Sequence, residues 1–266
     1  MKYKLYKGAL LYDGAPHEET KMSKTQCISL LKKHHAYFIR NVYDFDCDEQ
    51  TSFGYVIKDS YEELDSFSKK MKEHLRKSYI RFSVRKINKE EMIKNGYHIL
   101  KSAADSYDPP LSISGKEHFD QTILNAPSSV EYWGVFENVT QEMVAYAVTH
   151  CQGQCCCYDS AKAIPQFRKA YCMYPLIMEM NKYYLETLHL KYVSDGARSI
   201  TNHSNIQPFL MEKFHFRKAY CHVQIYYVWW LKILTTILFP FRSLFPAGRV
   251  KALLFQEEVR RNKHSW

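Results

Sequence analysis

A run of polar side chains at residues 195–199 follows a predicted strand and has the residue types for proton transfer and anion binding. The carboxylate of Asp195 can act as a base or hold an amine, and the guanidinium of Arg198 can bind a phosphate or carboxylate through two hydrogen bonds. Ligands of open α/β sheets usually bind at the ends of strands, where this run lies. The alternative is a structural turn, with Arg198 paired to Asp195. The polar lining for a substrate is completed by Ser199, His203 and Asn205.

Further candidates lie at the ends of three other predicted strands. Glu137 and His150 end two of these strands, and each can serve as a catalytic acid or base in the same cleft. From the third strand, Tyr158 or Asp159 can contact the substrate. A single histidine at a strand end is more often hydrogen-bonded or exposed than catalytic. The role of each of these residues therefore depends on the side chains around it.

A cysteine cluster surrounds His150 and has spacing that is partly compatible with zinc. Cys151 and Cys155 are separated by three residues, but a structural zinc site usually needs a second paired set of ligands. Adjacent strand residues point to opposite faces, so residues 155–157 cannot all reach one ion. We expect no metal and small buried strand residues instead. The N-terminal segment carries no export signal, so we expect reduced cysteines and a cytoplasmic protein.

The elements that position these residues follow from periodicity and turn signals. The N-terminal part predicts a helix over 22–45 and a strand over 52–58. The next predicted helix begins with a capping box at Ser60 and Glu63 and ends near Lys77. A strand over 79–87 follows, with Arg81 facing outward. Helices follow at 88–107 and 114–125. The remaining elements are strands at 131–137, 142–150 and 155–164, a helix from Pro175 to Leu188, a strand at 191–194, a helix at 206–214 and a strand at 219–227.

From residue 80 onward this order resembles that of GNAT-type acyltransferases. Local runs also resemble Fem-type aminoacyl transferases and related GNAT-like proteins of bacterial surface-polysaccharide gene clusters, at residues 167–177, 192–200 and 205–214. The resemblance implies an α/β (α+β) fold with a mixed, mostly antiparallel sheet and flanking helices. We expect a smaller N-terminal α/β half at 1–80, the GNAT-like domain at 81–227, and an apolar helix with a basic tail at 228–266.

In the GNAT family, a glycine-rich loop opens the central helix and offers backbone N–H groups to the pyrophosphate of the acyl carrier. The matching stretch here, 166–172, contains no glycine. The cationic side chains of Arg168 and Lys169 can supply charge to an anionic donor, but the departure speaks against acetyl-CoA or another acyl-CoA. The cofactor-binding residues implied by the resemblance are Arg168, Lys169, Ala170, Tyr171 and Cys172.

Charge and the C-terminal segment point to further partners. The formal net charge of +9 favours anionic partners, but aromatic side chains suited to base stacking are sparse in the basic stretch at 69–86, so we expect no sequence-specific nucleic acid. The apolar run at 228–251 is too short to span a bilayer. It can lie at the inner membrane face as an interfacial helix, or pack its Leu231, Leu234 and Leu238 stripe on the domain.

The prediction is a transferase that moves an acetyl or aminoacyl group from an anionic small-molecule donor to an amine or hydroxyl of a sugar-containing or other cell-surface precursor. The sugar acceptor comes only from the resemblance. The alternative is a non-catalytic protein with the same fold that docks to a membrane surface or an anionic partner.

Overall fold

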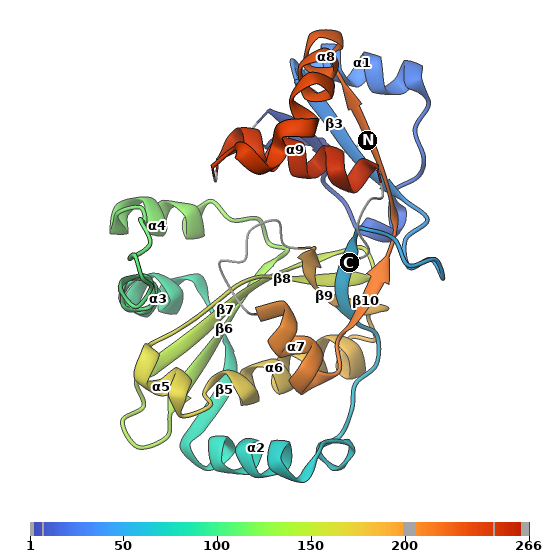
Figure 1. The fold of residues 1–266 in the computed structure, drawn as a ribbon. Helices are drawn as coiled ribbons and strands as arrows, with labels where there is room; N and C mark the ends of the chain where they lie inside the picture. The colour runs from blue at the N-terminus through green and yellow to red at the C-terminus, as the bar shows by residue number, and fades with distance from the viewer. Residues whose placement is uncertain (1–2, 7, 199–205, 247, 262–265) are drawn as a thin grey trace. The chain divides into compact units, whose positions relative to one another are not determined.

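The computed structural model describes residues 3–6, 8–198, 206–246, 248–261 and 266, and its backbone divides into two units (Figure 1). The first unit takes residues 1–57, 197–211 and 216–266, and the second takes residues 58–196 and 212–215. The chain passes between the units within β4, β9 and α7 and again after His215. Within the described ranges, every helix is too short or too polar to cross a lipid bilayer.

The first unit contains a four-stranded sheet in the order β1-β2-β3-β11, in which only β2 and β3 run parallel. An antiparallel pairing also joins β4 to β10. The elements that lie wholly or mostly in this unit are β1 (Tyr3–Tyr6), β2 (Ala9–Tyr12), α1 (Lys24–His34), β3 (Phe38–Tyr43), β4 (Gly54–Lys58), α7 (Ile206–Phe214), β10 (Arg217–Tyr220), β11 (His222–Tyr227), α8 (Trp229–Leu238) and α9 (Arg249–Arg260).

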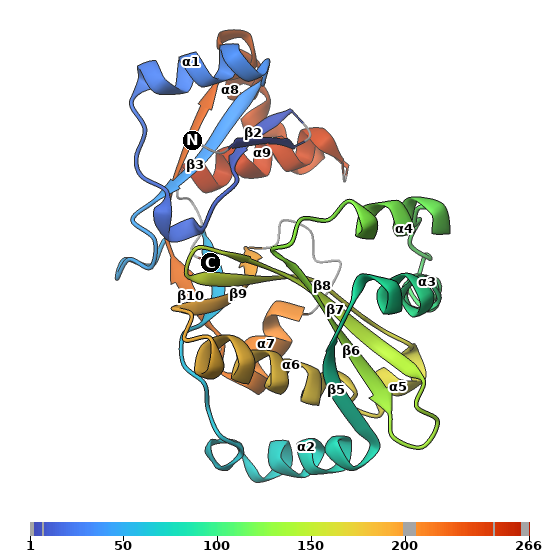
Figure 2. The same ribbon diagram turned by 180° about the vertical axis from the view of Figure 1, so that it is seen from behind.

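Both faces of the β1-β2-β3-β11 sheet are covered, because alternate side chains of its strands pack on different helices. Ile39 and Tyr226 pack with Leu31 of α1 on one face. Ile225 and Tyr227, the residues on either side of Tyr226, pack with Leu231 of α8 on the other face. Figure 2 shows α1 on one side of β3 and α8 with α9 on the opposite side.

The second unit contains five strands in the order β9-β8-β7-β6-β5. Neighbours from β5 to β8 pair antiparallel, and β8 pairs with β9 in parallel. The elements of this unit are α2 (Lys69–Arg81), β5 (Phe82–Ile87), α3 (Lys89–Asp105), α4 (Lys116–Leu124), β6 (Val130–Glu137), β7 (Met143–Gln152), β8 (Cys155–Ala163), α5 (Pro165–Lys169), α6 (Met173–Asn181), a π-helical segment (Lys182–Thr187) and β9 (Tyr192–Ala197).

Helices cover the two faces of this second sheet as separate layers. On one face, Met92 and Ile99 of α3 and Ile123 of α4 pack against Tyr132 and Tyr146 of the sheet. Helix α6 lies on the opposite face (Figures 1 and 2). A mixed, mostly antiparallel sheet flanked by helices confirms the predicted fold class.

Several predicted elements need correction. The predicted helix over 22–45 is wrong beyond His34, because His35 adopts a left-handed conformation (φ 50°) and the residues after Tyr37 form β3. The helix with the Ser60 capping box is also wrong at its start, since Ser68 caps α2 by accepting a hydrogen bond from the Met71 N–H. Arg81 belongs to the end of this helix rather than to a strand.

The predicted strand over 219–227 is two strands that separate at Cys221. Strand β10 pairs with β4, and β11 pairs with β3 in the other sheet. The buried Cys221 donates its backbone N–H to the carbonyl oxygen of Phe53, which fixes the change of direction. The predicted domain boundaries at residues 80 and 227 stay predictions, since the two units divide the chain by contacts rather than by consecutive ranges.

Candidate functional site

The candidate site lies where the parallel strands β8 and β9 of the second unit part. Their pairing joins residues 155–157 of β8 to residues 192–194 of β9. Strand β8 then continues to Ala163 and β9 continues beyond Ser194. In these described stretches the two strands do not pair with each other.

A β-bulge in β8 lies directly after the point of separation. On the neighbouring strand β7, Val148 lies opposite Ser160. The next residue, Thr149, lies opposite Tyr158, which leaves Asp159 as an extra residue on β8. A bulge of this kind changes the direction of a side chain and is frequent next to active sites.

The bulge brings the carboxylate of Asp159 to the imidazole of His150. The distance from Nδ1 of His150 to Oδ2 of Asp159 is 2.5 Å. The His150 side chain is 21% exposed and that of Asp159 is 42% exposed, so the pair is accessible to a substrate. With its proton held at Nδ1 by the carboxylate, a neutral histidine has its lone pair on Nε2 and can act there as a general base.

The opposite face of the sheet carries a buried polar network centred on the hydroxyl of Tyr184, in the π-helical segment. This hydroxyl accepts a hydrogen bond from Nε1 of Trp133 (2.9 Å), donates one to Oε2 of Glu131 (2.7 Å) and lies 2.7 Å from Oγ1 of Thr149. Burial raises the pKa of Tyr184 far above its ordinary value. The protonated phenol therefore ties the helix to β6 and β7, and a π-helical segment at this point is typical of functional sites.

Tyr158, predicted to bind substrate, lies on the same buried face. Its hydroxyl donates a hydrogen bond to Oδ1 of Asn181, 2.8 Å away. Burial raises the pKa of Tyr158 well above its ordinary value. Asp195 lies in the second unit, on the strand β9 that flanks the separation.

The remaining predicted residues lie elsewhere. Arg198 belongs to the first unit, where its Nη1 donates to the carbonyl oxygen of Ser52 at 2.6 Å. Glu137, at the far end of β6, accepts hydrogen bonds from Nε and Nη2 of Arg81 at 3.0 and 2.8 Å. Ser199, His203 and Asn205 lie outside the described residues. The roles of all these residues stay predictions.

The stretch that would hold the pyrophosphate of coenzyme A does not fit that group. Residues 164–174 form a closed turn in which the N–H groups of Arg168, Ala170, Tyr171 and Cys172 all donate to backbone carbonyls of the same stretch. Cys172 is buried, whereas Arg168 and Lys169 are exposed on the five-residue helix α5. An anion here would meet side-chain charge without the cradle of free N–H groups.

The cysteine cluster divides between the two faces of the sheet. Cys151 lies opposite Cys156 across the β7–β8 pair, and Cys157 lies opposite His150. Because adjacent strand residues point to opposite faces, Cys156 and Cys157 cannot reach one ion. In the part of the chain that the structure describes, no three histidine, cysteine or carboxylate side chains are arranged to hold a metal ion.

No protein-family model matches the sequence, and no curated protein matches it. Solved structures do match. FemX superposes with a TM-score of 0.57 at 12% identity, covering 80% of this chain and 77% of FemX. The match to L-PGS from Bacillus licheniformis has a TM-score of 0.52 at 10% identity and covers 89% of this chain and 83% of that one. The chain has a GNAT-like fold.

A third solved structure extends the comparison. The C-terminal domain of a putative lysylphosphatidylglycerol synthetase from Agrobacterium fabrum matches with a TM-score of 0.50 at 10% identity, covering 89% of this chain and 84% of that domain. At such identities the likeness concerns the GNAT-like fold alone. The resemblance that the sequence runs indicated is confirmed at this level.

Proposed function

We propose that the protein is an acyltransferase whose general base is His150, oriented by Asp159. The observation that carries this proposal is the 2.5 Å contact between the two side chains, made by a bulge next to the separation of β8 and β9. The GNAT-like fold supports a transferase in general, and FemX, L-PGS and the Agrobacterium fabrum domain share that fold.

The chemistry follows from the positions of these two residues. Nε2 of His150 takes a proton from the amine or hydroxyl of the acceptor as that atom attacks the acyl carbonyl carbon. The carboxylate of Asp159 stabilises the imidazolium that forms. A new bond to the acyl carbon forms, the bond between that carbon and the donor breaks, and the proton is passed to the leaving group of the donor.

The donor that we propose is an aminoacyl ester rather than an acyl-CoA. The closed turn at residues 164–174 lacks free N–H groups for a pyrophosphate. Lysylphosphatidylglycerol synthetase is named for an aminoacyl product. The acceptor that we propose is an amine or hydroxyl of a sugar-containing or other cell-surface precursor.

Transfer by the purified protein tests the proposal, with radiolabelled aminoacyl-tRNA or acetyl-CoA as donor and a panel of amino sugars and lipid-linked acceptors. Transfer from aminoacyl-tRNA should fall about 100-fold in His150→Gln and Asp159→Asn, the range of a lost general base. His118→Gln and Glu90→Gln, which change exposed side chains of α4 and α3, should transfer like the wild type. Full activity in both site variants would refute the assignment.

A second candidate function is non-catalytic docking with the same fold. The closed turn at residues 164–174 favours it, because the turn has lost the usual donor contacts. This function predicts neither transfer from any donor nor saturable binding of acetyl-CoA in calorimetry.

A further inference from the structure

Helix α8 and the 3₁₀ segment that follows it (Phe239–Leu244) expose a continuous row of large apolar side chains. The exposed fraction is 76% for Trp229, 60% for Ile237 and 77% for Leu244. Positions separated by three or four residues lie on one side of a helix, so these side chains form one surface. We call it the α8 apolar face; it comprises Trp229, Trp230, Ile233, Leu234, Ile237, Phe241 and Leu244.

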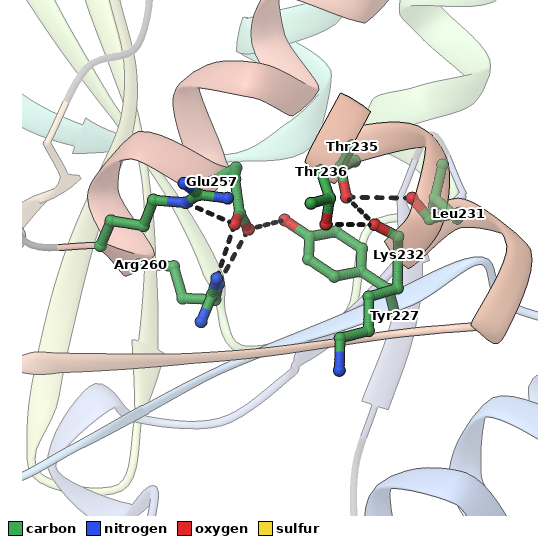
Figure 3. Close-up of polar contacts among 8 residues, drawn as sticks. Tyr227, Leu231, Lys232, Thr235, Thr236, Glu257 and Arg260 are labelled. Atoms are coloured by element: carbon green, nitrogen blue, oxygen red, sulfur yellow. Dashed lines mark hydrogen bonds and ion pairs between the residues drawn. The ribbon is translucent and has the colours of Figure 1, made fainter. Parts of the chain in front are cut away.

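The opposite side of α8 holds the helix on the sheet without help from this face. Leu231 packs with Ile225 and Tyr227 of β11. The side chain of Thr235 is also buried, and its hydroxyl donates to the backbone carbonyl of Leu231 at 2.9 Å (Figure 3). Residues on the exposed side can therefore serve a partner rather than the fold.

The surroundings of the α8 apolar face are cationic. No aspartate or glutamate occurs between Glu212 and Glu257. Glu257 is buried and bonded to Arg260 and Arg261, so its charge is compensated inside the unit. The exposed cations near the face are Lys232 on α8 and, at the start of α9, Arg249 and Lys251.

We propose that the α8 apolar face inserts into the headgroup region of a lipid bilayer that contains anionic lipid. Ten helical residues extend about 15 Å, half of the roughly 30 Å hydrocarbon thickness, so α8 lies along the surface instead of crossing it. Two tryptophans suit the boundary between lipid and water, and flanking lysine and arginine suit anionic headgroups. A second copy of the chain is a poorer occupant, because it would bring the same cations together.

This binding does not depend on the transfer reaction. It would nevertheless hold the protein at the surface where lipid-linked precursors are found. A protein that binds vesicles without transfer activity would leave this membrane proposal intact and refute the proposed function. An active enzyme that does not bind vesicles would refute the membrane proposal and leave the proposed function intact.

Co-sedimentation of the full chain with vesicles tests the proposal. Vesicles of phosphatidylcholine mixed with phosphatidylglycerol should bind the protein, and binding should weaken in high salt. The double variant Trp229→Ser, Ile237→Ser should bind at least about tenfold more weakly, because two anchoring side chains are lost. Lys232→Gln with Lys251→Gln should weaken binding by about tenfold and reduce its salt dependence.

Matched controls come from the second unit. Ile80 and Val139 are 79% and 88% exposed, and their replacement by serine should leave vesicle binding unchanged. Tryptophan fluorescence of the wild type should be quenched by brominated lipid, a readout that needs no variant. Equal binding to neutral vesicles would overturn the proposal, and so would full vesicle binding by the Trp229→Ser, Ile237→Ser double variant. The proposal is also overturned if the wild type binds no vesicles but forms a dimer that this double variant disrupts.

Discussion

The hydroxyl of Tyr227 on β11 donates a hydrogen bond to Oε2 of Glu257 on α9, 3.1 Å away (Figure 3). Glu257 exposes only 2% of its side chain. Burial alone would raise the pKa of this carboxyl, but hydrogen bonds from Arg260 and Arg261 outweigh it, and the net pKa is lowered. The carboxylate therefore joins α9 to the sheet in its ionised form.

Replacement of Glu257 by alanine should lower the free energy of unfolding of the first unit by about 2–3 kcal/mol, the value of hydrogen bonds to a buried charge. Tyr227→Phe should cost about 1 kcal/mol. The matched control is Glu258→Ala, which removes the half-exposed pair with Arg242 and should cost less than about 1 kcal/mol. Denaturant titrations of the three variants give the comparison, and equal losses at Glu257 and Glu258 would contradict it.

Acid should remove the contribution of Glu257. Its pKa is lower in the folded state than in the unfolded state, so the unfolded state takes up a proton first as pH falls. The stability from this carboxylate is complete above the ordinary pKa of 4.5 and is lost as pH falls through the folded-state pKa. The difference in the free energy of unfolding between wild type and Glu257→Ala should thus become smaller in unfolding curves measured below pH 4.5.

Glu19 should show the opposite pH dependence. Burial raises its pKa to about 7, although the N–H of Val42 donates to its Oε2 at 2.9 Å. The folded state therefore holds the proton more tightly than the unfolded state, and stability is lost as pH rises from about 4.5 to about 7. Glu19→Gln stays neutral, so it should be more stable than the wild type by about 2 kcal/mol at pH 8.

The advantage of Glu19→Gln should disappear near pH 4.5, where the wild-type carboxyl is protonated in the folded state. Thermal unfolding at both pH values measures it. Glu18→Gln, on an exposed neighbour, should change stability by less than about 0.5 kcal/mol. A constant offset between Glu19→Gln and the wild type at both pH values would show that burial does not perturb this carboxyl.

Gly54 is required by the close approach of two strands. A Cβ atom at this position would lie 2.3 Å from the backbone carbonyl oxygen of Ala219 on β10. Gly54→Ala should therefore cost at least about 2 kcal/mol, because backbone must shift. Gly115→Ala is the control, since a Cβ there meets nothing within 4 Å, and it should cost less than about 1 kcal/mol. Similar denaturation midpoints for both variants would contradict the steric argument.

Local signals predicted most of the second unit. Asn88 caps α3 as its side chain predicts, by accepting from the Glu91 N–H, and alternating residues predicted the hairpin of β6 and β7. The predictions were wrong where the apolar residues fit both the helical period and the strand period. In the segment after His34, helical spacing and strand spacing coincide. The pairing of β3 with β2 and with β11, the latter nearly two hundred residues away, decides for a strand.

The candidate site was predictable only in part. His150 was found because it ends a strand, whereas its partner Asp159 depends on a one-residue bulge that leaves no mark in the residue types. A two-residue hairpin turn at Gly153 and Gln154 does bring the two residues to facing strands, and this was the available signal. The contacts of Glu137 with Arg81 and of Arg198 with Ser52 come from distant chain segments, which periodicity cannot show.

Cys151 and Cys156 should form a disulfide on mild oxidation. The N–H of Cys151 donates to the carbonyl oxygen of Ser129, the residue before β6, so it points away from β8. The Cys151–Cys156 pair is then one of the non-hydrogen-bonded pairs of the β7–β8 ladder, whose Cα atoms lie about 4.5 Å apart. That separation is within the range that a disulfide spans.

Treatment with diamide, which is reduced as it takes up two hydrogen atoms from the thiols, should give one intramolecular disulfide and a mass lower by two hydrogen atoms. Peptide mapping should assign it to Cys151 and Cys156, and Cys151→Ser should abolish it. Cys27→Ser is the matched control, since Cys27 is a buried residue of α1 in the first unit and should not participate. The disulfide would form next to the buried network at Tyr184. Oxidation should therefore also slow the exchange of backbone amide hydrogens in β7 and β8. A disulfide that instead joins Cys151 to Cys155 or to Cys157 would show that the register of this hairpin differs from the one described.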